Sequence, residues 1–361
     1  FQPVRKVMKM EKLPCCIHTG VGSMPHDDPG YTVDLIIKEV PYAPFWPQLP
    51  ARDFREEMYY QYSEKFPCWV LDVESKKGYF RDDEDLYQDL ANFHEKFLSD
   101  EPEDLPISAE YASGLAEYLS RKDEISSMKP RFVKGQITGP ISMGLYLTVN
   151  RDKPVLYHPE LYEAMCTALL ANIRWMAKQL KKMGGRDVLI FVDEPYLASY
   201  GSGVIHMPEE IVNRSLKEFV DEVKSTGAVS GIHCCGNTDW SVVLRSGVEV
   251  INFDAYEYGE NFLLYRNDVA NFIKEGGVLA WGIVPTLPKA EILPAEEIAG
   301  QVEGMADRIS PEISIKNVLE HSMITPSCGM GALPVKKGEK ILRTTREVSE
   351  YLRKKYEMNT N

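Results

Sequence analysis

A histidine and a cysteine separated by one residue, His233 and Cys235, are the residues whose types and spacing point most directly to chemistry. They follow an apolar, β-prone run at residues 229–232. Side chains at positions i and i+2 of an extended segment point the same way, so the imidazole and the thiolate can share one metal ion. Nitrogen and sulfur ligands in this combination suit Zn²⁺. The pair therefore predicts half of a zinc site.

Polar residues also stand at the ends of other β-prone runs. They are Gly22 and Ser23, Thr138, Asp193 and Glu194, Asp254, and Ser327 and Cys328. If these runs are parallel strands of one barrel, their ends face one mouth, and Cys328 supplies a third soft ligand beside His233 and Cys235. The competing interpretation is that the cysteines are small buried hydrophobes, as Cys often is. Asp193 with Glu194 could likewise merely cap the next segment.

The remaining cysteines are expected to be inert. Cys234 alternates away from the His233 and Cys235 pair and is predicted to be a core residue. The others on apolar runs are Cys15, Cys16, Cys68 and Cys166. A total of seven cysteines in a chain of this size argues against a disulfide framework and for a reducing, cytoplasmic setting.

Composition excludes several classes of partner. The chain has 361 residues, 44% hydrophobic and 26% charged, enough for one large α/β barrel or two medium domains. Its formal net charge of −13 disfavours nucleic acid and anionic membranes as partners. No apolar run approaches the roughly 20 residues of a membrane span. Residues 1–12 are basic but lack the apolar core of a signal peptide, and we expect them to form an N-terminal extension.

Strands and helices alternate along the chain, which predicts a parallel sheet. The expected strands are 15–22, 43–46, 131–138, 187–192, 229–232, 248–253, 277–281 and 322–325. The expected helices are 29–40, 55–64, 82–98, 108–119, 159–183, 208–226, 294–309 and 338–356. Two β-rich runs at 67–80 form a hairpin outside this alternation. About eight strands, with no Gly-rich phosphate-binding motif after any of them, favour a single (β/α)₈ barrel over 1–361.

Five motifs, in this order along the chain, resemble the catalytic C-terminal half of the cobalamin-independent methionine synthase family, within the wider group of uroporphyrinogen-decarboxylase-like barrels. Gly22-Ser23-Met24-Pro25 is similar to its Gly-Ser-Phe-Pro turn, and Lys134-Gly135-Gln136-Ile137-Thr138-Gly139-Pro140 to its Lys-Gly-x-x-Thr-Gly-Pro. Val192-Asp193-Glu194-Pro195 matches its Ile-Asp-Glu-Pro. His233-x-Cys235 and Ser327-Cys328-Gly329 occupy the places of its zinc ligands. The resemblance extends over nearly the whole chain from about Cys16.

The resemblance implies a role for each matched position. His233, Cys235 and Cys328 would bind Zn²⁺, and Asp254 would be a fourth ligand where the family has a glutamate. Gly22 and Ser23 would hold the carboxylate of an amino-acid substrate. Asp193 would hold its ammonium group. A second acidic residue that the family uses for that ammonium has no clear counterpart near residues 52–57. The catalytic residues would be Asp193 and Asp254.

Two departures from the family bear on the methyl donor. The sequence has no counterpart of the family's N-terminal half, and Ile283 stands where the family places a histidine linked to protonation of the folate leaving group. Both argue against methyltetrahydrofolate. The run His233-Cys234-Cys235-Gly236-Asn237 also resembles the His-x-Cys-Gly of corrinoid-dependent thiol methyltransferases. A methylated corrinoid, such as methylcobalamin or a corrinoid protein, needs no protonation of its leaving group.

These features predict a zinc-dependent methyltransferase that activates homocysteine and converts it to methionine. A free thiol with a pKa of about 8.5 is mostly protonated at neutral pH, and coordination to a cation removes that proton. Three alternatives stay open: the same chemistry on another thiol such as coenzyme M, a uroporphyrinogen-decarboxylase-like enzyme, and a non-catalytic zinc-stabilised or corrinoid-binding barrel. Asp193 would repel the sulfonate of coenzyme M. The strand ends also carry few of the arginines that porphyrin carboxylates would require.

Overall fold

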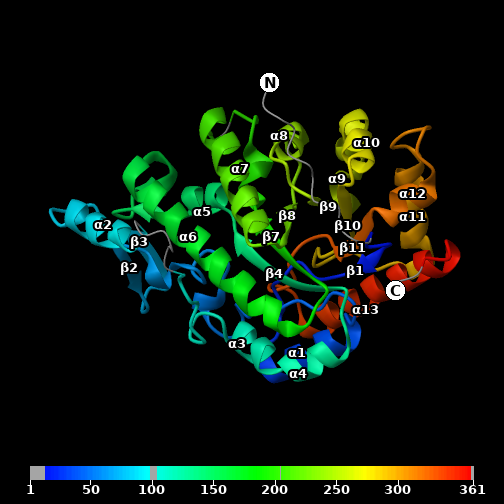
Figure 1. Cartoon of the computed structure of the whole chain (residues 1–361), viewed down its shortest axis with the longest axis horizontal. Helices are drawn as coiled ribbons and strands as arrows, with labels where there is room; N and C mark the ends of the chain where they lie inside the picture. Colours follow the sequence, from blue (N-terminus) through cyan, green and yellow to red (C-terminus); the bar gives the residue numbers. More distant parts are fainter. Residues whose placement is uncertain (1–12, 98–103, 204, 359–361) are drawn as a thin grey trace.

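A parallel sheet of seven strands lies at the centre of the computed structural model, which describes residues 13–97, 104–203 and 205–358 (Figure 1). The expected extension at 1–12 lies outside the described residues. Neighbouring strands follow the order β1-β11-β10-β9-β8-β7-β4, and every pairing between them is parallel. The strands are β1 Ile17–His18, β4 Phe132–Thr138, β7 Asp187–Asp193, β8 Val229–Cys234, β9 Val250–Asp254, β10 Val278–Val284 and β11 Ser322–Pro326. The predicted mixed α/β fold with a parallel sheet is thus confirmed.

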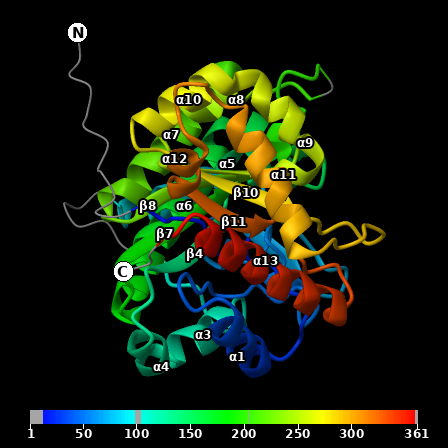
Figure 2. The ribbon, with the colours of Figure 1, turned by 90° about the vertical axis from the view of Figure 1, so that its right-hand side faces the viewer.

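Helices surround this sheet in both views (Figures 1 and 2). They are α1 Pro29–Glu39, α3 Ser113–Ser120, α4 Lys122–Ser127, α5 Pro140–Tyr146, α6 Pro159–Leu180, α7 Glu209–Ser225, α8 Trp240–Arg245, α9 Ala255–Phe262, α10 Arg266–Lys274, α11 Ala295–Asp307, α12 Ile315–Glu320 and α13 Val335–Lys355. Local signals in the sequence mark some of their ends. Asp28 caps α1 by accepting a hydrogen bond from the Tyr31 amide at 2.9 Å, and Gly184 has a left-handed φ of 78° after α6. Within the described ranges, no helix combines the length and low polarity that a bilayer crossing requires.

The predicted hairpin at 67–80 is present as β2 Trp69–Asp72 and β3 Lys77–Phe80, paired antiparallel. It belongs to a second, four-stranded sheet with β5 Thr148–Val149 and β6 Lys153–Pro154. Helix α2, Leu86–Glu95, lies beside this sheet at one end of the molecule (Figure 1). The insertion between residues 49 and 112 therefore forms, together with β5 and β6, a second layer that the alternation of strands and helices did not predict in full.

The predicted strand at 43–46 is wrong as a continuous strand. Residues 42–48 instead make isolated bridges: Phe45 with Lys134 of β4, and Gln48 with Ser23, just after β1. Prolines at 41, 44, 47 and 50 explain this, because a proline has no amide hydrogen with which to continue a ladder. The remaining amides are used: Trp46 donates to the Lys134 carbonyl at 3.3 Å, and Gln48 donates to the Gly22 carbonyl at 3.1 Å.

The predicted helix at 55–64 is also wrong. The structure has two short 3₁₀ turns there, Phe54–Glu56 and Ser63–Lys65, joined by further turns. Tyr59, Tyr60 and Tyr62 are all buried. On a regular helix these three side chains would point in widely different directions, so a single apolar face could not bury them together. The predicted helices at 82–98 and 108–119 are shorter than expected, as α2 and α3 show.

The inner face of the parallel sheet changes from apolar to polar along the strands. A separate core cluster contains residues from each of its seven strands together with Ala43: Ile17, Ala43, Phe132, Leu189, Phe191, Val229, Val250, Val278, Ala280 and Met323. Because side chains alternate, residues two or four positions later on the same strands share this face. They are Lys134, Asp193, His233, Asn252 and Thr325, all buried. The polar residues thus gather toward the carboxyl ends of the strands.

Candidate metal centre

Three of the predicted ligands meet in the structure. The ligand atoms of His233, Cys235 and Cys328 all lie within 4.8 Å of one another. His233 is the fifth residue of β8, Cys235 follows the end of that strand, and Cys328 lies two residues beyond β11. His233 is 3% exposed, and the two cysteines are partly buried. Strands β9 and β10 lie between β8 and β11, and because all four strands are parallel, the residues that follow β8 and β11 meet at the carboxyl ends of the strands.

The residues present fit a zinc ion. Nε2 of His233 is buried and has no hydrogen-bond partner among the described residues. A buried nitrogen without a partner carries a desolvation penalty of about 1–3 kcal/mol, which a coordinated cation would remove. One imidazole and two thiols also match the donor set of zinc sites with three protein ligands.

The electrostatics of the cluster favour a bound cation. Burial lowers the pKa of His233, but its interactions with Cys328, Asp193 and Asn252 raise that pKa by more. The pKa of Cys328 is raised well above its usual value, first by the neighbouring Cys235 thiol and then by burial. Two thiolates this close repel each other, and a divalent cation between them would reverse this effect.

Asp254 does not belong to the cluster of three. Its Oδ1 accepts a hydrogen bond from the Glu257 amide at 2.8 Å, and the residue caps the N-terminus of α9. Burial raises the pKa of Asp254 to about 6. The carboxylate is engaged as a helix cap and would have to leave that position to bind a metal ion. The roles of Asp254 as a fourth ligand and as a catalytic residue stay predictions.

Asp193 stands beside the cluster at the end of β7, where it is paired in register with His233 of β8 and Thr138 of β4. It is 4% exposed, and its Oδ1 is buried without a hydrogen-bond partner among the described residues. Burial raises the pKa of Asp193 to about 6, although His233 and Lys134 act in the opposite direction. An unsatisfied carboxylate oxygen at this position can accept a hydrogen bond from a cationic group of a ligand.

Lys134 is a fully buried lysine on the same face of the sheet as Asp193 and His233, and its place beside the site was not predicted from the sequence. Its Nζ donates to the Val21 carbonyl at 2.6 Å and to Oε1 of Gln136 at 3.2 Å. Burial lowers the pKa of Lys134 to about 7, while Asp193 acts to raise it. The carbonyl that Lys134 holds immediately precedes Gly22, so the lysine supports the turn that carries Ser23.

Gly22 and Ser23 lie against the turn that carries Cys328. The Met330 amide donates to the Ser23 carbonyl at 2.9 Å. A Cβ atom on Gly329 would lie 3.2 Å from Cβ of Ser23. A side chain on Gly22 would meet Gln136 at 2.8 Å, so this turn requires glycine. The predicted substrate-binding turn and the third predicted metal ligand, Cys328, are therefore neighbours.

A relay of side-chain amides connects Ser23 with the insertion. The Ser23 hydroxyl donates to Oε1 of Gln48 at 3.2 Å, and Nε2 of Gln48 donates to Oε1 of Gln61 at 2.8 Å. Gln61 in turn donates to the Tyr111 carbonyl at 3.0 Å. Because Gln48 and Gln61 are both buried, an unpaired amide here would be costly, and the relay determines where Ser23 points.

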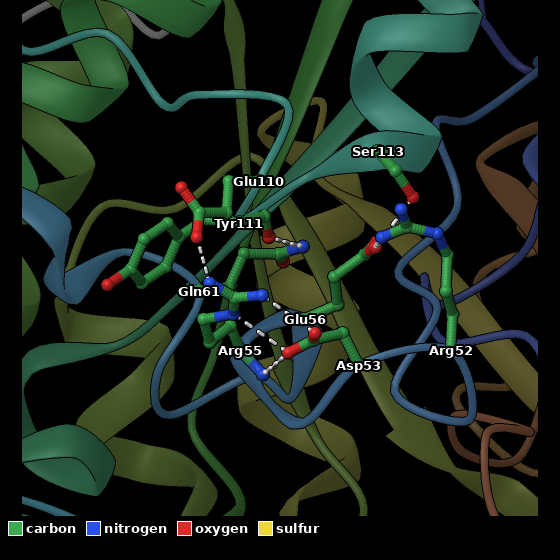
Figure 3. Close-up of polar contacts among 8 residues, drawn as sticks. All are labelled: Arg52, Asp53, Arg55, Glu56, Gln61, Glu110, Tyr111 and Ser113. Atoms are coloured by element: carbon green, nitrogen blue, oxygen red, sulfur yellow. Dashed lines mark hydrogen bonds and ion pairs between the residues drawn. The ribbon is translucent and has the colours of Figure 1, made fainter. Parts of the chain in front are cut away.

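Charged residues fasten the two ends of the insertion together (Figure 3). Glu56 is fully buried and accepts hydrogen bonds from Arg52 at 2.8 Å and from the Ser113 hydroxyl at 2.6 Å. Arg55 pairs with Asp53 at 2.9 Å and also with Glu110. Both hydrogen bonds reach Oε1 of Glu56, so one oxygen of this carboxylate is engaged in the network. Its other oxygen, Oε2, is buried without a hydrogen-bond partner among the described residues, in the stretch 52–57 where the sequence shows no clear second acidic residue for an ammonium group.

The cysteines predicted to be inert contribute no ligand atom to the cluster. Cys234 is fully buried, and burial raises its pKa to about 12. Cys16, Cys68 and Cys166 are also buried, whereas Cys15 is partly exposed. The prediction that Cys234 is a core residue is confirmed.

Comparisons with known proteins assign no family to this chain. Neither a scan against protein-family models nor a search of curated proteins found a match. Among solved structures, the chain is similar to a crystal structure of D-psicose 3-epimerase in the presence of D-fructose, with a TM-score of 0.30 and 11% sequence identity. That similarity covers 65% of this chain and 93% of the epimerase. A likeness this weak supports no inference about activity, and the resemblance to methionine synthases stays a prediction.

Proposed function

We propose that this protein is a zinc-dependent methyltransferase that converts homocysteine to methionine, with a methylated corrinoid as the methyl donor. The observation that carries the proposal is the cluster of His233, Cys235 and Cys328 with the unpartnered Nε2 of His233. Zinc bound there would lower the pKa of an incoming thiol and hold its sulfur as a nucleophilic thiolate. Methyl transfer to that sulfur then needs no general base.

Asp193 and Ser23 would select the acceptor. The buried carboxylate of Asp193 lies beside His233, where it would accept hydrogen bonds from the ammonium group of homocysteine. Ser23, with the Gly22 backbone, would bind the carboxylate. Coenzyme M and similar sulfonates are poorer candidates because Asp193 would repel their negative charge.

Ile283 is the residue that favours a corrinoid over a folate as the methyl donor. It is 1% exposed and belongs to the core that packs against the helices, so it provides no proton at the position where the resembling family has a histidine. A folate leaving group requires protonation, whereas a cob(I)alamin leaving group departs as a stable anion. A methylated corrinoid, carried by a partner protein or free, therefore suits this site better than methyltetrahydrofolate.

The fold we propose is a closed (β/α)₈ barrel in which residues 42–48 take the place of the second strand. Hydrogen bonds join this segment to β4 on one side and to the turn after β1 on the other. Ala43 contributes to the same inner cluster as the seven strands. Catalytic residues of such barrels lie at the carboxyl ends of the strands, as the proposed ligands do.

Metal analysis of the purified protein tests the zinc site. We expect about one equivalent of zinc in the wild type and less than about half an equivalent in Cys328→Ala, because two protein ligands hold zinc far less tightly than three. Cys234→Ala is the matched control and should keep its zinc, since Cys234 points into the core. Unchanged zinc in Cys328→Ala, or less than about half an equivalent in the wild type, would contradict the proposal.

The methyl donor is tested by supplying homocysteine with methylcobalamin or with methyltetrahydrofolate and measuring methionine. We expect methionine from methylcobalamin only. Methionine formed from the folate alone would refute the inference from Ile283. A zinc-loaded protein that makes no methionine from either donor would favour a non-catalytic zinc-stabilised barrel.

A further inference from the structure

Asn252 of β9 is a fully buried neighbour of His233 whose amide makes three hydrogen bonds. Its Nδ2 donates to the Ala280 carbonyl at 2.8 Å and to the Thr325 hydroxyl oxygen at 2.9 Å. Its Oδ1 lies 2.7 Å from Nδ1 of His233. The amide thus links β8 to β10 and β11 inside the sheet, directly behind one of the proposed metal ligands.

The orientation of this amide follows from the Ala280 carbonyl, which can only accept a hydrogen bond. Nδ2 of Asn252 must therefore face Ala280, because a flipped amide would place two oxygens against each other. Oδ1 must then face His233. Since Oδ1 can only accept, the hydrogen between the two residues must reside on Nδ1 of the imidazole.

A neutral imidazole that carries its hydrogen on Nδ1 has its lone pair on Nε2. Nε2 of His233 is buried and has no hydrogen-bond partner in the described part of the chain, and His233 shares the cluster with Cys235 and Cys328. We propose that Asn252 is a positioning residue that holds His233 in the Nδ1–H tautomer and aims Nε2 at a divalent metal ion. This inference rests on the proposed zinc site for its purpose, but the tautomer itself does not depend on the metal.

Ala280 and Thr325 hold the Asn252 amide in place. They lie on the adjacent strands β10 and β11, and Ala280 contributes a backbone carbonyl while Thr325 contributes its side-chain hydroxyl. Outer partners of this kind orient a histidine ligand and raise its basicity, and their loss lowers metal affinity by roughly 10- to 100-fold. A flexible or absent partner would let the imidazole rotate or adopt the other tautomer.

Zinc affinity, measured by competition with a chromophoric chelator, tests the role of Asn252. We expect Asn252→Ala to bind zinc about 10- to 100-fold more weakly than the wild type. Asn252→Asp keeps an acceptor for Nδ1–H and should retain more affinity than Asn252→Ala. Asn172→Ala is the matched control: Asn172 is a buried asparagine of α6 that donates to the Leu105 carbonyl at 2.7 Å, and its loss should leave zinc affinity within about twofold.

The tautomer is measured independently by ¹⁵N NMR of histidine-labelled, zinc-free wild-type protein at alkaline pH. The His233 signal, assigned by its loss in His233→Gln, should show a protonated Nδ1 and an unprotonated Nε2. A proton on Nε2, or a folded Asn252→Ala that binds zinc as tightly as the wild type, would overturn the inference. A wild type that binds no zinc but shows the Nδ1–H tautomer would refute the proposed function and the metal-directed purpose of Asn252, while confirming that Asn252 sets the tautomer of His233.

Discussion

Asp193 and His233 are neighbours at the ends of β7 and β8, and we propose that one binds the substrate and the other binds the metal ion. The two residues are paired in register, both are buried, and each has one polar atom that finds no partner within residues 13–97, 104–203 and 205–358. Nε2 of His233 faces the thiols, whereas Oδ1 of Asp193 has no partner among the described residues. Buried polar atoms are normally paired, and under the proposed function a zinc ion would pair with Nε2 and the substrate ammonium group with Oδ1.

Removing the charge of Asp193 should weaken substrate binding without removing the metal. We expect Asp193→Asn to raise KM for homocysteine by roughly 10- to 100-fold, because a charge-assisted hydrogen bond contributes about 1.5–3 kcal/mol. Steady-state kinetics with metal analysis checks this. Asp187→Asn, at the other end of β7 where Asp187 pairs with Arg131, should leave KM unchanged. A variant with normal KM would show that Asp193 does not bind the ammonium group.

At the scale of elements, a buried histidine joins β1 to α1. Nε2 of His18 lies 2.7 Å from the Glu39 carbonyl at the end of α1. Burial, together with the positive charges of Arg346 and Arg353, lowers the pKa of His18 to about 4. The hydrogen bond to Glu39 acts in the opposite direction but does not compensate for burial. The neutral imidazole is therefore the form that the folded protein accommodates.

This histidine should make the stability of the protein fall with decreasing pH. The folded pKa of about 4 lies below the unfolded value of about 6.5, so the unfolded state binds the proton first and stability is lost as pH falls from 6.5 toward 4. At pH 5 the loss is about 2 kcal/mol. Urea unfolding at pH 7.5 and 5.0 should show this loss in the wild type and less of it in His18→Gln, whose amide can still donate to Glu39. An equal loss in both would contradict the assignment.

At the scale of the whole molecule, residues 42–48 decide whether the parallel sheet closes. Prolines interrupt the segment, yet Trp46 and Gln48 donate to backbone carbonyls on its two sides, and Met24 donates back to the Gln48 carbonyl at 2.9 Å. Closure would leave the sheet without a free edge, which is the usual reason that barrels resist pairing with other chains. The polar inner ends of the strands would then form the bottom of one enclosed mouth.

Hydrogen exchange tests this closure. If the sheet closes, the amides of Trp46 and Gln48 should exchange about as slowly as those in the middle of β4 and β10, because opening them would require β1 and β4 to separate from the segment between them. Amides of β2, in the insertion, serve as the comparison and should exchange faster. Fast exchange at Trp46 and Gln48 would mean that the sheet is open between β1 and β4.

Much of the fold was predictable because its signals are local. Apolar strands and amphipathic helices alternate in the sequence, and caps such as Asp28 and Gly184 mark helix ends through interactions within a few residues. That His233, Cys235 and Cys328 come together was predictable for a similar reason. His233 and Cys235 are two residues apart on an extended segment, so their side chains point to the same face, and Cys328 follows the end of another strand.

Other features depend on contacts between distant segments, and only the three-dimensional arrangement revealed them. The aromatic residues near Tyr60 were predicted as a helix, but burial against several surfaces favours turns there. Nothing in the sequence indicated that Asn252 contacts His233, since a single asparagine in an apolar strand has many possible hydrogen-bond partners. Its role follows from Ala280 and Thr325, which lie on other strands. Residue types and periodicity thus specify which groups can do chemistry. Hydrogen bonds across the sheet decide how those groups are oriented. Each such bond joins two residues that lie far apart in the sequence, so the sequence alone does not identify them as partners.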